Sequence, residues 1–157
     1  MDDSRLDDIE EARQKFLNHD FEEKEFSVDA ERLAKYAKAC GETMPKFIDP
    51  TDADFQATPT WSSCLSPDRL LPDGFPMFDG FTLDGGKDVQ PLAPIRPGAT
   101  LTGRSHVHDI YTKTGRSGRM IFIVSRMELT DQTGKKVAIS DTRVVIRENG
   151  AKKEAAK

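Results

Sequence analysis

Residues 119–147 read RMIFIVSRMELTDQTGKKVAISDTRVVIR, two runs rich in β-branched and aromatic residues around a polar, glycine-containing connection. A third run of this kind, residues 100–111, precedes them across the glycine-containing residues 113–118. Such runs favour strands, and such connections favour hairpins. The pattern predicts a meander of three long antiparallel strands at 100–111, 119–130 and 136–147. Because strands of this length exceed the average, we expect a sheet that wraps around another element.

Two helices are predicted before the meander. Residues 6–17 place apolar side chains on one helical stripe, with acidic residues early in the segment. Residues 29–40 carry a clearer stripe, which Ser27 or Asp29 can cap and Gly41 can end. The members of this second stripe recur at i, i+3, i+4 and i+7: Leu33, Tyr36, Ala37 and Cys40.

Proline divides the rest of the chain. All nine prolines lie between Pro45 and Pro97, and proline interrupts helix interiors and central strands. In this broken middle we expect loops and one short helix of about two turns, which Pro59 begins and Pro67 ends. Two early helices, a short middle one and a long meander predict an α+β fold.

The composition of the chain limits the classes of protein to which it can belong. The 157 residues are 36% hydrophobic and carry a net charge of −4, which suits one globular domain. There is no concentrated basic face, so we expect no nucleic acid as a partner. No apolar run reaches the roughly 18 residues of a membrane helix, and the N-terminus lacks a secretory signal. We therefore expect a cytoplasmic protein without a membrane partner.

Four stretches carry a family resemblance. In chain order they are residues 26–41, 57–61, 83–86 and 94–101, and the meander follows them. Together they resemble the MaoC-like dehydratase family, and above all its FAS1-like N-terminal branch. The resemblance covers residues 22–147. It implies a single hot-dog domain at 22–148, in which an antiparallel sheet wraps a short central helix. An acidic N-terminal helical extension at 1–21 and a disordered tail at 149–157 would flank it.

The resemblance also implies a chemistry. Members of the family hydrate trans-2-enoyl-CoA thioesters to 3-hydroxyacyl-CoA, or run the dehydration, without a cofactor. Two hot-dog units pair side by side into one continuous sheet. An Asp, and a His five residues later, supply the base and the acid, in a stretch that resembles G-D-x-N-P-x-H.

The corresponding stretch here, residues 41–47, reads GETMPKF. Gly41 and Pro45 keep the register, so Glu42 occupies the Asp position and Phe47 the His position. A phenyl ring cannot transfer a proton. The extra methylene of Glu42 moves its carboxylate by about an ångström, which can cost roughly 100-fold in rate. We expect no working catalytic pair on this chain, with Glu42 and Phe47 as degenerate positions.

Candidate substrate-binding residues follow from the resemblance. Thr60 and Trp61 open the central helix, whose free N–H groups suit a thioester oxygen. Since prolines shorten this helix, we expect unusual volume inside the sheet, lined by aromatic residues and open to a bulky acyl group such as a sterol side chain. The alternative is that these aromatics fill the gap themselves. These aromatic residues are Phe75, Phe78 and Phe81. Gly85 and Arg96 complete the predicted set of substrate-binding residues. Other basic residues that could contact the CoA phosphates are Lys113, Arg116 and Arg119.

Other reactive side chains have simpler interpretations. His106 and His108 are a candidate proton relay or metal pair, but we expect two polar residues on the face opposite Val107 and Tyr111. Cys40 and Cys64 form no CxxC pair, so neither a disulfide scaffold nor a zinc ribbon is indicated, and Cys64 is expected to be buried. Asp49, Asp52 and Asp54 lack the remaining ligands of an EF-hand, so turn roles are expected and no metal is predicted.

The sequence therefore predicts a subunit of a heteromeric enoyl-CoA hydratase or 3-hydroxyacyl-CoA dehydratase. In this hypothesis the chain shapes an acyl-CoA pocket while a catalytic MaoC-like hot-dog subunit supplies the Asp and His. Three alternatives stay open. They are a self-sufficient homodimeric hydratase using Glu42, a hot-dog thioesterase using Glu42 or Asp49, and a non-catalytic acyl-CoA binding module.

Overall fold

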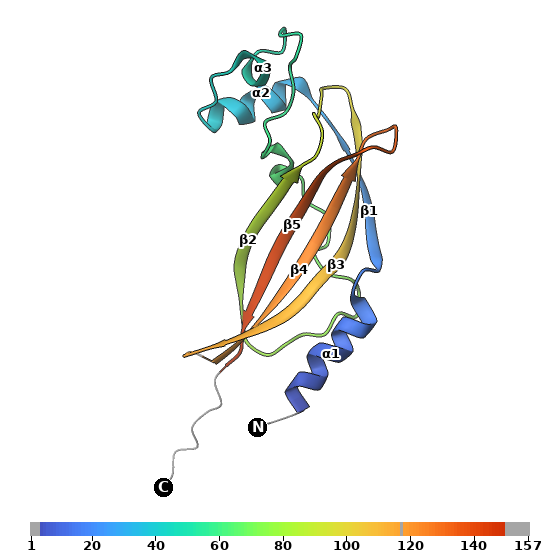
Figure 1. Cartoon of the computed structure of the whole chain (residues 1–157), viewed down its shortest axis with the longest axis vertical. Helices are drawn as coiled ribbons and strands as arrows, with labels where there is room; N and C mark the ends of the chain where they lie inside the picture. The colour runs from blue at the N-terminus through green and yellow to red at the C-terminus, as the bar shows by residue number, and fades with distance from the viewer. Residues whose placement is uncertain (1–3, 117, 150–157) are drawn as a thin grey trace.

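The computed structural model describes residues 4–116 and 118–149. One five-stranded antiparallel sheet has the order β1-β3-β4-β5-β2, with α2 and α3 at one end and α1 at the other (Figure 1). The predicted α+β fold is confirmed. In chain order the elements are α1 (Ser4–Phe16), β1 (Asp20–Ser27), α2 (Ala30–Ala39), α3 (Pro45–Ile48), the 3₁₀ turn η1 (Trp61–Cys64), β2 (Phe81–Pro91), β3 (Thr100–Gly115), β4 (Gly118–Thr130) and β5 (Lys136–Arg147).

The predicted meander is the centre of this sheet. β3 pairs with β4 and β4 with β5, both antiparallel, and β3 continues four residues beyond the predicted end at residue 111. Ile110 lies opposite Ile123, and Ile121 lies opposite Ile146. These side chains are buried on one face, which we call the inner face. The predicted helices also form, and Asp29 caps α2 by accepting the Arg32 N–H at 2.9 Å.

A β-bulge in β3 overturns one expected alternation. The register shifts between Val107 and Asp109, so the bulge inserts one extra residue, His108. Val107 and Ile110 are therefore both buried in the inner-face core. Tyr111 is turned to the outer face instead, where its ring stacks on Phe122 with centroids 4.8 Å apart. The expectation that Tyr111 lies opposite the histidines is wrong.

The two edge strands, β1 and β2, were not expected as strands. β1 reads DFEEKEFS and is half exposed, while β2 reads FTLDGGKDVQP and is exposed along most of its length. Charged residues and glycines are unfavourable in strands by propensity. Here the neighbouring strands β3 and β5 supply the pairing that propensity does not predict.

The inner face buries two apolar clusters. The α2 cluster joins α2, η1 and one end of the meander, and the α1 cluster joins α1 to the other end. Ile9 and Ala12 of α1 belong to the second, so the N-terminal helix packs directly on the sheet. The α2 cluster includes Leu33, Trp61, Leu65, Ile95, Leu101, Met127 and Leu129; the α1 cluster includes Val107, Ile110, Ile121, Ile123 and Ile146.

The expected two-turn central helix is reduced to η1, a single 3₁₀ turn of four residues. The chain after it crosses the inner face as an irregular segment fixed from both sheet edges. Lys24 of β1 donates to the Ser66 carbonyl at 3.2 Å, and Lys87 of β2 donates to the Ser63 carbonyl at 2.9 Å and the Ser66 hydroxyl at 3.4 Å. Because residues of opposite edges reach the same serine, the sheet curls around this segment.

Glu22 of β1 fixes the next residues of the segment. Its carboxylate, whose side chain is 9% exposed, accepts the N–H groups of Asp68 at 2.6 Å and Arg69 at 3.0 Å. The predicted tail lies outside the described residues except for Asn149, whose amide donates to Asp79. No helix in the described part of the chain is long and apolar enough to cross a membrane.

Candidate functional site

Glu42 lies just after α2, in a turn that Gly41 makes possible. Gly41 has φ +79° and the Glu42 N–H donates to the Ala37 carbonyl, as in a glycine C-cap. The Glu42 carboxylate accepts the N–H groups of Met44 at 3.0 Å and Thr43 at 2.9 Å. These two bonds, Met44 first, lower the pKa of Glu42. A carboxylate held ionised in this way is poorly matched to general-base catalysis near neutral pH.

Phe47 follows in α3, a single turn with Pro45 at its start. Its ring is buried, with the Lys46 ammonium 4.9 Å from the ring centroid. Phe47 therefore presents an apolar wall. That Glu42 and Phe47 stand at degenerate catalytic positions stays a prediction.

Thr60 and Trp61 lie at the start of η1, as the resemblance implied. The Trp61 side chain is buried, while Thr60 is exposed and its hydroxyl lies 3.1 Å from the Tyr36 hydroxyl. The Trp61 N–H donates to the Thr58 carbonyl at 3.0 Å. That N–H is thus occupied within the chain, and the predicted thioester contact at this turn stays a prediction.

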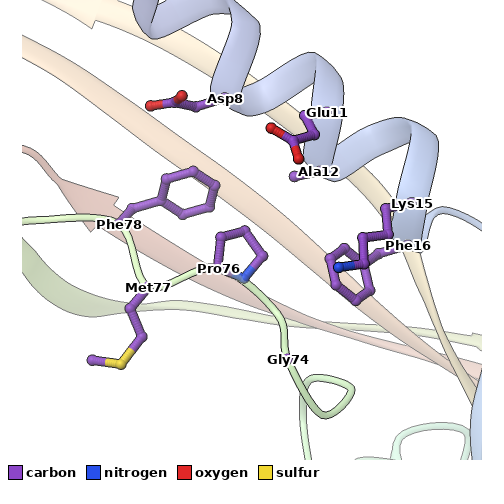
Figure 2. A pocket seen from close by; sticks show the side chains of 9 residues that line it. All are labelled: Asp8, Glu11, Ala12, Lys15, Phe16, Gly74, Pro76, Met77 and Phe78. Carbon is purple, nitrogen blue, oxygen red and sulfur yellow. The ribbon is translucent and has the colours of Figure 1, made fainter.

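The aromatic residues of the proline-broken segment separate into two places. Phe75 packs against Phe16 of α1 with ring centroids 5.1 Å apart, and against Phe78 at 6.3 Å. Figure 2 shows Phe78 and Pro76 turned toward α1. Phe81 is 68% exposed and lies opposite Arg147, on the outer face with Leu83. Phe75 and Phe78 thus partly fill the gap left by the central helix, and Phe81 does not join them.

A pocket of about 210 Å³ remains between α1 and residues 74–78. Figure 2 shows its two sides, with Asp8, Glu11 and Lys15 on the helix and Phe78 below them. Met77 points away from the helix and is almost fully exposed. Trp61 does not line this pocket, so it is not the aromatic-lined volume beside Trp61 that the sequence predicted.

Gly85 and Arg96, the last predicted binding residues, have structural contacts. A Cβ on Gly85 would lie 2.7 Å from Val145 Cγ2, so the missing side chain lets the bulged part of β2 approach β5. Arg96 is exposed and lies 3.7 Å from the Asp54 carboxylate. Their roles toward a substrate stay predictions.

The remaining candidates are explained by local structure. Asp49 accepts the Thr51 N–H and hydroxyl, and Asp52 accepts the Asp54 N–H, which are the expected turn roles. His106 and His108 pack edge to face on the outer face, and burial lowers the pKa of His106. Cys64 is exposed, contrary to expectation, because η1 turns Trp61 and Leu65 inward instead. No cluster of three potential metal ligands occurs in the part of the chain that the structure describes.

Sequence reasoning missed a cavity of about 290 Å³ beside Phe47. Its walls come from α3, η1, the chain between them, residues 91–95 at and after the end of β2, and Ala138 of β5. Thr58 and Ser62 both line it. No motif marks these two residues, because a hydroxyl in a loop carries no signal until the fold buries it.

Comparisons with known proteins agree with this geometry. A family model described as "FAS1-like, dehydratase domain region" matches residues 15–140. A MaoC-like dehydratase from Phytophthora capsici is 28% identical, with a TM-score of 0.65 over 88% of this chain and 50% of that one. This chain therefore spans half the length of the Phytophthora chain. A comparison with curated protein sequences found no match.

Two structures from Mycobacterium tuberculosis share the fold at lower identity. The ChsH1-ChsH2 complex matches at 14% identity and a TM-score of 0.68, over 94% of this chain and 96% of that one. The HadBC (3R-hydroxyacyl-ACP dehydratase) complex matches at 20% identity and a TM-score of 0.59, over 78% and 90%. The expected MaoC-like hot-dog fold is confirmed.

Proposed function

Because this chain belongs to the FAS1-like dehydratase-region family, we propose that it is the non-catalytic subunit of a heteromeric enoyl-CoA hydratase or 3-hydroxyacyl-CoA dehydratase. One observation carries the proposal. The ring of Phe47, at the position where the resemblance implies a histidine, is buried, and the Glu42 carboxylate accepts two backbone N–H groups. Hydration of the double bond needs a base for water and an acid for C2, and the partner supplies both.

The edges of the sheet support a partner at β2. β1 carries five charged residues among its eight, a composition that protects an edge from pairing. β2 instead exposes Phe81 and Leu83, and no strand of the described residues pairs with its outer edge. An edge strand with exposed apolar side chains is suited to pairing with another chain. Two structural relatives, ChsH1-ChsH2 and HadBC, are described as complexes.

The proposed acyl-CoA site lies between the two chains, along β2, rather than inside this sheet. Phe75 and Phe78 occupy part of the inner face, where the sequence had suggested room for a sterol-like group. In this proposal Phe81 and Leu83 contribute the wall that this chain presents to the acyl group or to the partner. Arg96 is the proposed contact for the CoA phosphates.

The experiment compares the full chain alone with the full chain co-expressed with a hot-dog subunit that retains Asp-x4-His, encoded by an adjacent reading frame. Assayed with a 2-enoyl-CoA, the chain alone is expected to be inactive and the pair active. Hydration by the chain alone identifies a homodimeric hydratase, and thioester cleavage identifies a thioesterase. Binding without turnover in both preparations identifies an acyl-CoA binding module. Each of these three results contradicts the proposal.

Restoring the family's residues tests the same point in this chain. Glu42→Asp combined with Phe47→His puts both groups of the motif back. The double variant is paired with a partner subunit whose own histidine is replaced by alanine, and this pair is assayed for hydration. If this chain lacks activity only because of positions 42 and 47, the pair is expected to show measurable hydration. If neither the wild-type pair nor the double variant hydrates the substrate, the assignment is wrong.

A further inference from the structure

The outer face of the sheet has two halves of different chemistry. In the half toward α2, basic side chains are paired with acids: Arg104 with Glu23, Arg126 with Asp141, Lys136 with Glu128 and Arg143 with Asp88. The half next to the β3–β4 hairpin carries apolar side chains and cations, without an acid. The strand register places its eight residues in two rows, which we call the outer patch: Lys113, Met120, Arg147 and Phe81, and then Tyr111, Phe122, Val145 and Leu83.

The cations of the outer patch lack acidic partners. The Lys113 ammonium lies over the Tyr111 and Phe122 rings, 5.7 and 5.3 Å from their centroids. Lys113 and Arg147 are exposed, and neither forms an ion pair with a residue that the structure describes. Arg116 adds a third exposed cation at the tip of the hairpin, which extends past the ends of β2 and β5 (Figure 1). This face is therefore complementary to an occupant that carries negative charge.

The outer patch also exposes apolar surface beside these cations. Phe81 is 68% exposed and Leu83 is 48% exposed. Tyr111 and Phe122 are half-buried, and Val145 between Phe122 and Leu83 is buried. Apolar side chains bordered by lysine and arginine suit a lipid surface, where the apolar groups enter the interface and the long basic side chains reach the headgroups.

Other occupants fit the outer patch less well. Small ligands bind in concave sites, and this face is convex because the sheet curls around the segment on its inner face. A second copy of the patch would bring cations against cations with no acid between them. Four strands about 4.8 Å apart and two rows about 7 Å apart give a patch of roughly 270 Å², whereas a stable protein interface buries about 800 Å² on each partner.

We propose that the outer patch is a peripheral contact site for an anionic lipid surface. Phe81 and Leu83 enter the interface below the headgroups, while Lys113, Arg147 and Arg116 face the lipid phosphates. Such a contact needs no membrane-spanning helix, although it departs from the sequence-based expectation of no membrane partner. It goes beyond the proposed function, because a partner strand at β2 extends the sheet in its plane and leaves the outer face open.

The test is co-sedimentation of the full chain with vesicles of phosphatidylcholine alone and with vesicles that also contain about 30% phosphatidylglycerol. Since the chain has a net charge of −4, its overall charge opposes binding to anionic vesicles, and binding has to come from a local basic surface. We expect binding to the anionic vesicles, little binding to the neutral ones, and a weaker interaction in about 0.5 M NaCl. No binding to the anionic vesicles, or equal binding to both kinds, would overturn the proposal.

Paired substitutions locate the contact. Lys113→Gln combined with Arg147→Gln is expected to lower the partition coefficient on anionic vesicles about 25-fold, at about fivefold for each cation lost. Lys35→Gln combined with Lys38→Gln makes the same change of net charge on α2, at the other end of the sheet (Figure 1). This matched control is expected to bind within about twofold of the unchanged chain. Equal losses in the two double variants would show a diffuse charge effect and contradict the proposal.

Phe81→Trp gives a readout that does not depend on charge. Trp61, the single tryptophan of the chain, is buried, so a change of emission on binding reports on position 81. The emission is expected to shift to the blue on anionic vesicles and to be quenched by brominated acyl chains. Unchanged emission from bound protein would show that the contact lies elsewhere. If the chain binds no vesicles, and the Lys113 and Arg147 double variant instead disrupts a complex with a hot-dog subunit, the outer patch is a protein interface and the proposal is wrong.

Discussion

The meander and the segment that crosses its inner face are held in different ways. β3, β4 and β5 bury rows of isoleucine, leucine and valine against one another, and Ile121 and Ile123 are fully buried. The segment after η1 also packs apolar side chains such as Leu65 and Phe75 on the inner face, but its backbone is fixed by polar contacts to the two edge strands, from Glu22, Lys24 and Lys87. A hot-dog sheet can therefore keep its framework with a single 3₁₀ turn in place of a longer central helix, when apolar packing and edge-strand polar contacts together fix the chain that follows.

The largest expected effect is in the meander. Ile123→Ala removes a fully buried side chain at the centre of the α1 cluster and is expected to destabilise the protein by about 3–4 kcal/mol. Urea unfolding measures the loss. Ile139→Ala, a half-buried outer-face position in β5, is the control with a smaller expected cost. Equal losses would mean that the inner-face rows do not dominate stability.

A smaller effect is expected where the segment rejoins the sheet. Gly85→Ala would place its Cβ 2.7 Å from Val145 Cγ2 and 2.9 Å from Arg143 Cβ. Relieving this overlap is expected to cost about 1–3 kcal/mol, measured by thermal unfolding. Gly115→Ala, where an added Cβ meets nothing within 4 Å, is the control and should be close to neutral. If both variants behave alike, the contact of the β2 bulge with β5 is unimportant.

The polar contacts themselves are tested at Glu22. Glu22→Gln weakens two charge-assisted bonds to the Asp68 and Arg69 N–H groups and is expected to cost about 1–2 kcal/mol. Glu23→Gln, which removes an exposed pair with Arg104, should cost under about 0.5 kcal/mol. Urea unfolding measures both. A larger loss at the exposed pair would contradict the proposed role of Glu22 in fixing the segment.

The smallest effect is at Glu42 and depends on pH. Because the folded-state pKa of Glu42 is lowered, its contribution is complete above the unfolded-state pKa and is lost as the pH falls through the folded-state value. Glu42→Gln should therefore lower the Tm at about pH 6, and the difference should disappear only below the folded-state pKa of Glu42, which lies under the unfolded-state value of about 4.3. Thermal unfolding across this pH range measures the difference. A difference that persists in acid would point to packing rather than to charge.

Several features follow from the sequence because their signals are local. The meander has long β-rich runs with glycine turns, and α2 has its Asp29 cap and its Gly41 end. The predicted loss of the catalytic pair rests on equally local signals, since Gly41 and Pro45 keep the motif in register around Glu42 and Phe47. Such features depend on neighbours a few residues apart, and no distant contact was needed to predict them.

The tertiary structure decided the rest, because distant parts of the chain supply the partners. β1 and β2 are strands only because β3 and β5 pair with them, and the bulge at His108 changes which side chains of β3 face inward. The cavity beside Phe47 exists only because residues 91–95 and Ala138 of β5, distant in sequence, complete its wall. The sequence by itself determined the fold family, and it predicts from Glu42 and Phe47 that the acid–base pair is missing. Only the packing of segments far apart in the chain determined which side chains line that cavity and which share one face of the sheet.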